Sequence, residues 1–490
     1  MSQYFRFRTA ERLLGRPASE TAEARPGELD ELSIYFASPE ELNDPLEGHR
    51  ETCFSGDLIV WKNLIKHYTV MLYEAVIDRY AGENKGLMHI NLSPSNFHGE
   101  SRGYLETAIN SVQSCAAIRM YLEALTSVER TVSRVELSAH LATLHSTILS
   151  YILEVLENCL NIHEAQMYKQ SRGNFQNYIF LRSNEIRTAG QNSNIQAYVE
   201  IKDKFKQQAI RACVFRDQEL DPNALRLFAN FPEEFSTQLD YLMYPRWYVA
   251  CFMKSCSNSA IWGSYGDNHK GVCLIYSSDV NNGKDSLLLR KLPFPFVQGY
   301  HFGRPKHEYY LNMPLSLPLV EVKYKPEYYT PNFFDSILTV NKDWAMKYWY
   351  TDKNGDISRN AASMYQKPSA VWPVHKEQFL RSCTNKTAHW ENETEARIIL
   401  SGIELTREER LVNYSFHQLE GIIFGIKTPD AAKIKIIKKI SDHCKTHRRS
   451  DFKFYQAKFD SKYEEIEYVH LKYITYNSDG TLNLDPQLPS

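Results

Sequence analysis

Within the stretch KTAHWENETEARIIL, residues 386–400, two glutamates and an arginine recur at every second position. On a strand over residues 393–400, Glu393, Glu395 and Arg397 project from one face, while the residues between them project from the other. Two carboxylates this close repel, so we expect one pKa to rise while Arg397 holds the other down. The pair could then transfer a proton, or a glutamate could stabilise an oxocarbenium-like sugar cation, as in glycoside hydrolysis. A half-buried strand with its charged face in water explains the same spacing.

A second dense segment contains the turn GDNHKG, which is predicted to lead into a strand beginning at Val272. The preceding helix or loop carries Trp262 and Tyr265. His269 beside a lysine could bind an anion such as phosphate, whereas a hairpin turn with a solvated histidine is the structural alternative. No G-x-S-x-G elbow accompanies these residues, which argues against a serine-triad hydrolase.

The N-terminal stretch SIYFASPEELNDPLEG, residues 33–48, predicts a strand, a short helix and an abrupt corner. From Ser38 to Glu41 the S-P-x-E sequence combines a capping hydroxyl, a proline at the first helical position and a carboxylate that reaches back. Asn43 and Asp44 precede a proline, which pushes Asp44 out of the helical region and ends the helix.

The composition is that of a globular protein with little net charge. Of 490 residues, 43% are hydrophobic, and the net charge of −2 creates no global field that would draw the chain to nucleic acid. The nine cysteines are scattered and form no C-x-x-C, which suits a reducing cytoplasm. The N-terminus has no signal-peptide core, and the most apolar helical stretch, residues 142–163, is broken by His, Glu and Asn. We therefore expect a cytoplasmic protein that does not span a membrane.

Periodicity divides the chain into three parts. Residues 1–60 alternate as strands and turns, and the strand YFRFR places Arg6 and Arg8 on one face. Residues 61–230 carry apolar stripes at helical spacing. Residues 231–480 form the remainder of the sheet domain, in which strand signals return from about residue 245. The simplest architecture is α+β, with a mixed or antiparallel sheet domain built from both chain ends and a large helical insertion between them. The insertion could bind a partner or form a homo-oligomer.

A basic segment near the C-terminus predicts a helix capped by Thr428 with Pro429. Its lysines could make a weak contact with RNA or DNA, although such a run is usually a solvated helix face. The lysines concerned are Lys433, Lys435, Lys438 and Lys439.

Other enzyme classes lack their signatures. No phosphate-binding G-x-x-x-x-G-K-[ST] loop, no G-x-G-x-x-G and no H-E-x-x-H is present, and histidines do not gather with cysteines at metal-ligand spacing, so we expect no bound metal. A metal-dependent nuclease stays open as an alternative, since Asp44, Glu47, Glu393 and Glu395 could converge in space around Mg²⁺.

These segments, taken together and in this order, resemble a bacterial family grouped as a domain of unknown function. Its marks are a Y-x-Y/F-R strand, an F-x-S-P-x-x-F-N-D-P-F-E corner, a central W-x-x-Y-x-x-x-H-x-G-v-C and a late K-x-x-x-W-x-x-E-x-E-x-R. The matching residues are Tyr4 to Arg8; Phe36, Ser38, Pro39, Leu42, Asn43, Asp44, Pro45, Leu46 and Glu47; Trp262, Tyr265, His269, Gly271 and Cys273; and Lys386, Trp390, Glu393, Glu395 and Arg397. The helical section looks longer than the family norm, and leucines replace phenylalanines at the corner. The resemblance implies that the corner, the central segment and the late strand belong to one site.

The layout also looks similar to that of ADP-ribosyltransferases, which carry an Arg or His on the first strand and a late glutamate, often in E-x-E. That resemblance implies that Arg6 or Arg8 would hold the phosphates or ribose of NAD. Tyr35 or Tyr265 would stack on the nicotinamide.

The late glutamates take the chemical roles in this resemblance. Glu395 would stabilise the ribosyl cation as nicotinamide leaves, and Glu393 would orient the acceptor, with Asn43, Asp44 and His269 lining the site. We therefore expect an NAD-dependent ADP-ribosyltransferase or NAD glycohydrolase, in a bacterial toxin or phage-defence effector. The alternatives are the nuclease and a non-enzymatic module that binds a ligand or peptide.

Overall fold

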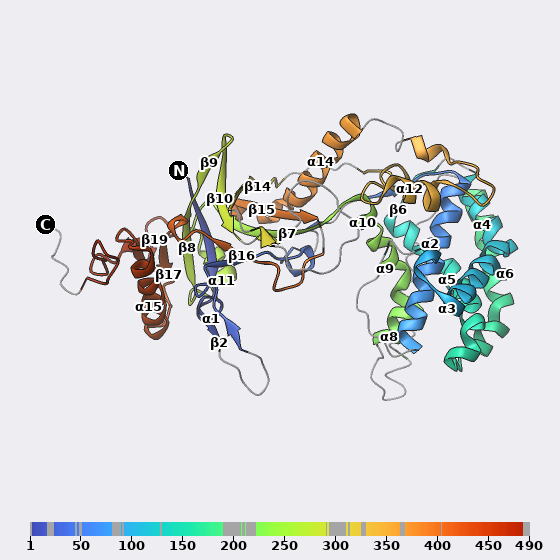
Figure 1. Cartoon of the computed structure of the whole chain (residues 1–490), viewed down its shortest axis with the longest axis horizontal. Coiled ribbons are helices and arrows are strands. Elements are labelled where there is room, and N and C mark those ends of the chain that lie inside the picture. The colour runs from blue at the N-terminus through green and yellow to red at the C-terminus, as the bar shows by residue number, and fades with distance from the viewer. Residues whose placement is uncertain are drawn as a thin grey trace. The chain divides into compact units, whose positions relative to one another are not determined.

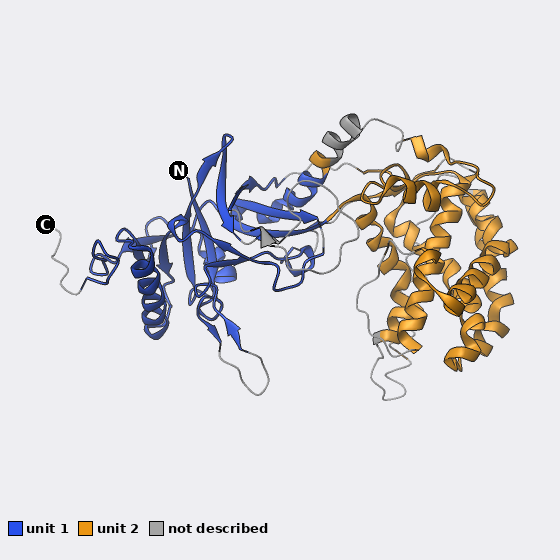
Figure 2. Cartoon of the chain, in the orientation of Figure 1, with its two compact units in different colours: residues 1–49, 246–327, 379–490 blue, residues 50–245, 328–378 orange. Residues whose placement is uncertain are grey.

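The chain forms two compact units, each built from separate stretches of sequence (Figure 2). Unit 1 consists of residues 1–49, 246–327 and 379–490, and unit 2 of residues 50–245 and 328–378. The computed structural model describes residues 2–16, 24–44, 47–48, 51–80, 90, 93–127, 130–189, 207, 211, 222–290, 292–293, 310–311, 314–324, 330–362, 368–402 and 404–483. Unit 2 thus contains the predicted insertion and, in addition, a second segment that the periodicity had assigned to the sheet domain.

Unit 1 is organised around an eight-stranded sheet, the main sheet, in the order β14-β15-β7-β1-β8-β17-β18-β19 (Figure 1). Its strands are β1 (Gln3–Arg8), β7 (Arg246–Met253), β8 (Val272–Ser277), β14 (Val320–Glu321), β15 (Glu395–Gly402), β17 (Leu419–Phe424), β18 (Lys453–Asp460) and β19 (Glu465–His470). The pair β17–β18 is parallel and the other pairs are antiparallel, so the sheet is mixed. The predicted α+β class, with the first strand inside a sheet of late strands, is confirmed.

A second sheet of five strands belongs to unit 1. Its order is β13-β10-β16-β4, with β9 paired to β10. The strands are β4 (Ser33–Tyr35), β9 (Asp279–Asn281), β10 (Lys284–Arg290), β13 (Leu315–Pro318) and β16 (Leu411–Tyr414). Other elements of the unit are α1 (Ala10–Leu14), β2 (Gly15–Arg16), β3 (Arg25–Pro26), α11 (Ser259–Tyr265), β11 (Leu292–Pro293), β12 (Tyr310–Leu311) and α15 (Asp430–His447).

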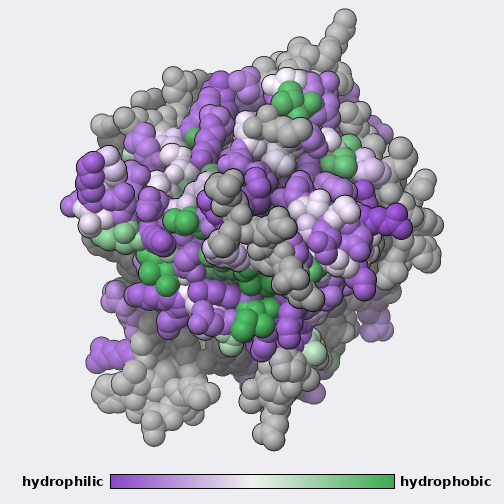
Figure 3. All heavy atoms as spheres, turned by 90° about the vertical axis from the view of Figure 1, so that its left-hand side faces the viewer, coloured by the Kyte–Doolittle hydropathy of each residue, from purple (hydrophilic) through white to green (hydrophobic). Residues whose placement is uncertain are grey.

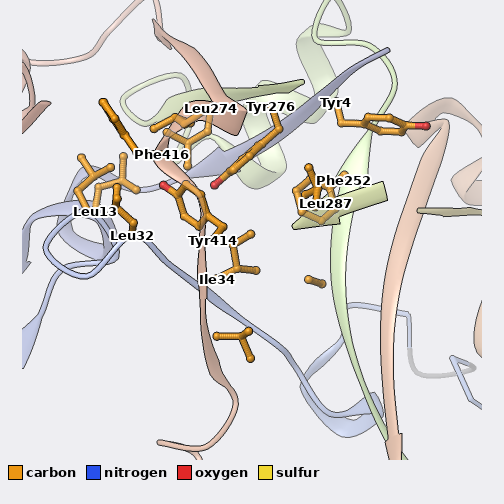
Figure 4. Packing of buried hydrophobic residues seen from close by; sticks show 14 of the residues in the cluster. Tyr4, Leu13, Leu32, Ile34, Phe252, Leu274, Tyr276, Leu287, Tyr414 and Phe416 are labelled. Atoms are coloured by element: carbon orange, nitrogen blue, oxygen red, sulfur yellow. The ribbon is translucent and has the colours of Figure 1, made fainter. Parts of the chain in front are cut away.

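The main core of unit 1 lies on one face of the main sheet (Figure 4). Tyr4, Phe252 and Tyr276 of the main sheet pack there with Leu287 and Tyr414 of the second sheet. The opposite face carries a smaller apolar cluster in which Phe5 and Phe7 contact Trp262 of α11. Both faces of β1 are therefore covered, as its alternation of side chains requires. On the face drawn in Figure 3, the described residues are mostly hydrophilic, with separate apolar patches. Exposed apolar side chains of this kind are normal at a protein surface.

Unit 2 is built mainly from helices. They are α2 (Leu58–Tyr80), α3 (Gly99–Ser114), α4 (Ala116–Thr126), α5 (Arg134–Leu160), α6 (Ala165–Ala189), α8 (Pro222–Leu225), α9 (Phe231–Gln238), α10 (Asp240–Met243) and α12 (Lys342–Ala345), with a small ribbon of β5 (Cys53–Phe54) and β6 (Val132–Ser133). Among the described helices, α5 alone has the length and composition to cross a membrane, and 72% of its most apolar stretch is buried. Most of this stretch is therefore packed inside the protein.

Candidate functional site

Two acidic side chains in the corner after β4 are buried in unit 1. The predicted capping box is present, because the Ser38 amide donates to Glu41 Oε2 at 3.0 Å and a single 3₁₀ turn, Pro39–Glu41, follows. Beyond it Asn43 is exposed, whereas Asp44 and Glu47 are only 4% and 7% exposed. Pro45 and Leu46, part of the predicted corner, lie outside the described residues.

The predicted strand over residues 393–400 begins two residues late, at Glu395. Glu393 instead ends the 3₁₀ helix Ala388–Glu393, and Thr394 adopts the left-handed conformation, with φ 44° and ψ 51°. This reversal brings both glutamates to one lysine, with Lys386 Nζ 2.6 Å from Glu393 Oε2 and 3.3 Å from Glu395 Oε2. The expectation of a solvated charged face is wrong, because Glu393 and Glu395 are each 3% exposed.

Five buried charged groups form what we call the Lys386 cluster: Glu47, Lys386, Glu393, Glu395 and Arg397. Lys386 also lies 3.2 Å from Glu47 Oε1, and Arg397 Nε lies 2.8 Å from Glu395 Oε1. The Arg397 Nη2 group bonds to Glu47 and to Glu395. Three carboxylates against two cations leave one negative charge in excess.

The environment of the cluster shifts the pKa values of two of its carboxylates in opposite directions. Burial alone would raise the pKa of Glu395, but Arg397 and Lys386 outweigh it and hold that pKa below its ordinary value. For Glu47 burial prevails over the same two cations, and its pKa is raised. The three carboxylates raise the pKa of Lys386 against the opposing effect of burial, so the lysine stays charged. The structure thus gives opposite pKa shifts to Glu395 and Glu47, a different pair from the one for which the sequence predicted them.

Glu393 connects the cluster to the surface. Its Oε1 accepts a hydrogen bond of 2.6 Å from the phenol of Tyr265, a half-buried residue at the end of α11. Burial, and then the bond to Glu393, raise the pKa of this phenol, while a hydrogen bond with the exposed Asn43 opposes the shift. The side chain of Thr387 donates to Asp44 Oδ2 at 3.4 Å. Through Tyr265, Glu393 is therefore linked to Asn43, which is exposed.

One comparison with known proteins bears on this part of the chain. Residues 261–398 match the model of a family described as a protein of unknown function, DUF2971. The matched segment runs from α11 into β15 and contains Tyr265, Lys386, Glu393, Glu395 and Arg397. No curated protein and no solved structure matches the chain.

Two further predicted residues of the DUF2971 segment lie under or beside α11. Trp262 is a core residue, 1% exposed, whose indole donates to Cys256 O at 2.8 Å and whose ring packs edge-on against Phe7. His269 sits in the turn before β8 with φ 70°, and its backbone amide donates to Trp262 O. Burial and the charge of Lys427 lower its pKa. The described contacts link neither side chain to the Lys386 cluster.

The predicted phosphate-binding arginines face the other way. In the register of the main sheet Glu395 pairs with Met253, which pairs with Phe5, so these three share a face. Arg6 and Arg8 alternate with Phe5 and project from the opposite face.

Arg6, Arg8 and Tyr35, which were predicted to bind NAD, form hydrogen bonds or ion pairs with nearby residues of unit 1 instead. Arg6 is 4% exposed, donates to Tyr35 O at 2.9 Å, and has its pKa lowered to about 10 by burial and then by Arg8. Arg8 pairs with Glu28 at 2.9 Å, and the Tyr35 phenol bonds to Glu41. The structure therefore does not bring Arg6, Arg8 or Tyr35 to the Lys386 cluster.

The sequence pattern gave Lys386 no role beyond a family mark, although it touches all three carboxylates. Two other residues that contact the cluster were also not predicted from the sequence. The Tyr324 hydroxyl accepts a hydrogen bond from the Glu395 amide at 2.7 Å, and the Cys383 carbonyl accepts one from Arg397. No sequence motif pointed to either residue. Both contacts depend on chain reversals that no periodicity encodes. Among the described residues no group of His, Cys, Asp or Glu could hold a metal ion, since Lys386 and Arg397 occupy the cluster's carboxylates.

The basic helix α15 differs in one detail from its prediction. Its N-cap is Pro429, while the Thr428 hydroxyl donates to Gly271 O at 2.7 Å. Lys433 pairs with Asp430 and Lys439 with Asp30. The two other predicted lysines are exposed, and these are Lys435 and Lys438.

Proposed function

We propose that unit 1 is an ADP-ribosyltransferase-like enzyme that cleaves the glycosidic bond of NAD at the Lys386 cluster, as a bacterial toxin or phage-defence effector would. One observation carries the proposal: Glu393 is held between Lys386 and the phenol of Tyr265, a half-buried residue. Displacing Tyr265 would free one carboxylate oxygen while Lys386 keeps the other in place.

Within this proposal Glu393 takes the role of the carboxylate that faces the developing ribosyl cation. A fixed negative charge next to an oxocarbenium-like centre lowers the barrier to loss of the leaving group. In a site shielded from water that attraction is stronger than in bulk solvent. Nicotinamide then departs, and water or an acceptor nucleophile attacks the same carbon.

Glu395 acts as a positioning residue rather than a catalytic one. Its Oε1 bonds to Arg397 Nε and its Oε2 contacts both Arg397 and Lys386, so neither oxygen is left for substrate. Arg397, fully buried, fixes this carboxylate from the floor of the cluster. The proposal assigns no role to Arg6 and Arg8, because they project from the opposite face of the main sheet.

The nuclease and binding-module alternatives lack a specific observation in their favour. Glu47, Glu393 and Glu395 do converge, but each of them already pairs with Lys386 or Arg397. A nuclease would need Mg²⁺ to displace these buried cations.

The test is nicotinamide release from NAD by the purified full chain, with and without total bacterial RNA and protein as acceptors. We expect Glu393→Gln to lower kcat at least 100-fold, the scale seen when one charge-stabilising group is removed. Glu391→Gln is the matched control, because Glu391 lies in the same 3₁₀ helix with its side chain exposed, and it should retain wild-type turnover. A folded wild-type protein that neither binds NAD nor releases nicotinamide would overturn the proposal. Full turnover by a folded Glu393→Gln variant would overturn the role of Glu393.

A further inference from the structure

Arginines gather on unit 1 around α1 and the β2–β3 ribbon, which lie next to each other in Figure 1. We call this group the arginine cluster, and its members are Arg8, Arg12, Arg16, Arg25 and Arg407. Arg8 ends β1, the next three belong to α1 and the ribbon, and Arg407 precedes β16.

The ribbon places two of these charges directly opposite each other. Arg16 and Arg25 are cross-strand partners in β2–β3, and both are exposed. Like charges in this position destabilise a strand pair unless an anion lies between them. No side chain within the described residues bonds to either guanidinium.

Among the described residues, the carboxylates that interact with these arginines are Glu28, which pairs with Arg8, and Glu41 and Glu408, whose pKa values the charge of Arg407 helps to lower. Arg8 Nε lies 2.9 Å from Glu28 Oε2, and the Glu28 amide donates to Arg12 O at 2.9 Å, which ties Glu28 to α1. Arg12 and Arg407 bond to no carboxylate among the described residues. The charges of Arg8, Arg25 and Arg407 add to burial in lowering the pKa of Arg12, with Glu28 opposing them. In the described part of this surface five arginines therefore face three carboxylates, which leaves an excess of positive charge in a chain that is nearly neutral as a whole.

We propose that the arginine cluster binds phosphate groups, at a site separate from the Lys386 cluster. A guanidinium presents two parallel N–H donors to a phosphate and keeps its charge at any pH at which the protein folds. Several on one surface match a ligand with more than one phosphate, which is either a nucleic-acid strand or a free nucleotide. The proposal does not depend on cleavage of NAD, because the cluster is reached from the other face of the main sheet.

Helix α15 is a weaker candidate for the same ligand. Two of its four lysines are paired with aspartates, and the remaining two are solvated. Lysine also offers a point charge rather than a paired donor.

The test measures binding of a fluorescein-labelled single-stranded 20-nucleotide RNA, and of the same DNA sequence, by fluorescence polarisation from 50 to 300 mM salt. The variant Arg12→Gln/Arg25→Gln/Arg407→Gln removes three exposed charges. The control Lys284→Gln/Lys458→Gln/Lys472→Gln removes three exposed charges elsewhere on unit 1. Circular dichroism checks that both variants fold.

We expect the arginine variant to bind at least ten-fold more weakly than the control. Its salt dependence should be shallower by about 2, because each lost phosphate contact on a single strand contributes about 0.7 to the slope of log K against log salt. Competition by millimolar ATP would identify a nucleotide as the ligand, and failure of ATP to compete would identify the strand. Equal affinity and slope in the two variants, or a wild-type protein that binds neither probe, would overturn the proposal.

Discussion

Replacing Lys386 by methionine removes one buried cation and keeps an apolar side chain of similar length. Lys386 Nζ lies 2.6, 3.2 and 3.3 Å from Glu393, Glu47 and Glu395, and its side chain is 4% exposed. The variant leaves three carboxylates facing Arg397 alone, so the excess negative charge of the cluster doubles.

The magnitude follows from the balance of attraction and desolvation. At an effective dielectric constant of 20, an ion pair at 3 Å gains about 5 kcal/mol, and much of that gain offsets the removal of both ions from water. Breaking a buried pair from one side costs about 3–5 kcal/mol, because the partner stays buried without compensation. We expect Lys386→Met to lower the free energy of unfolding of unit 1 by that amount at pH 7.5.

The assay must report unit 1 by itself, because tryptophans occur in both units. Hydrogen exchange of peptides from β15 and β7, followed by mass spectrometry, meets this need. At pH 5 the difference from wild type should be smaller. Without the lysine the pKa values of the carboxylates rise, and protonation of one of them removes the excess charge.

A charge-balanced double variant provides the control. Lys386→Met/Glu393→Gln leaves two carboxylates and one cation, the same net charge as wild type, and should recover at least about 1 kcal/mol of the loss. Unchanged exchange in Lys386→Met, or a double variant less stable than the single one, would refute the view that the lysine balances this cluster.

Two other expectations concern stability. In unit 2, His145 is buried between the Tyr68 phenol and Leu227 O, and burial lowers its pKa to about 4. From pH 7.5 to pH 5 the unfolded chain takes up a proton there while the folded chain does not, so unit 2 should lose about 2 kcal/mol; exchange of α5 peptides measures this loss, and His145→Asn should reduce it. In unit 1, Gly48 has φ 72° and an added Cβ would lie 2.9 Å from Trp247 Cζ2. Gly48→Ala should therefore cost about 1–3 kcal/mol in urea unfolding, and a cost below 0.5 kcal/mol would contradict the tight corner.

Local sequence patterns were sufficient to predict features that involve only residues close together in the chain. The S-P-x-E signal gave the capping box, because a capping box involves only residues within one turn. The alternation in YFRFR correctly placed Arg6 and Arg8 together. It could not tell which face they share with Glu395, because that depends on the register of three strands far apart in sequence.

The start of β15 shows why the rest of the site could not be predicted from the sequence. Thr394 is β-branched, and the left-handed conformation is uncommon for such a residue, so the E-x-E spacing read naturally as a continuous strand. The bond between Arg397 and Glu47 joins residues 350 positions apart. Only tertiary packing brings such residues together.

The place of β1 between β7 and β8 also sets the order in which the chain can fold. Phe5 pairs with Met253, which is synthesised 248 residues later. At about 5–20 residues per second, the first strand waits roughly 12–50 seconds on the ribosome before a neighbour exists. During that interval the long helices of unit 2 emerge and can form through contacts close in sequence. The nascent chain thus carries an unpaired, aromatic N-terminal strand while a helical unit forms, and an exposed strand of this kind is prone to aggregation.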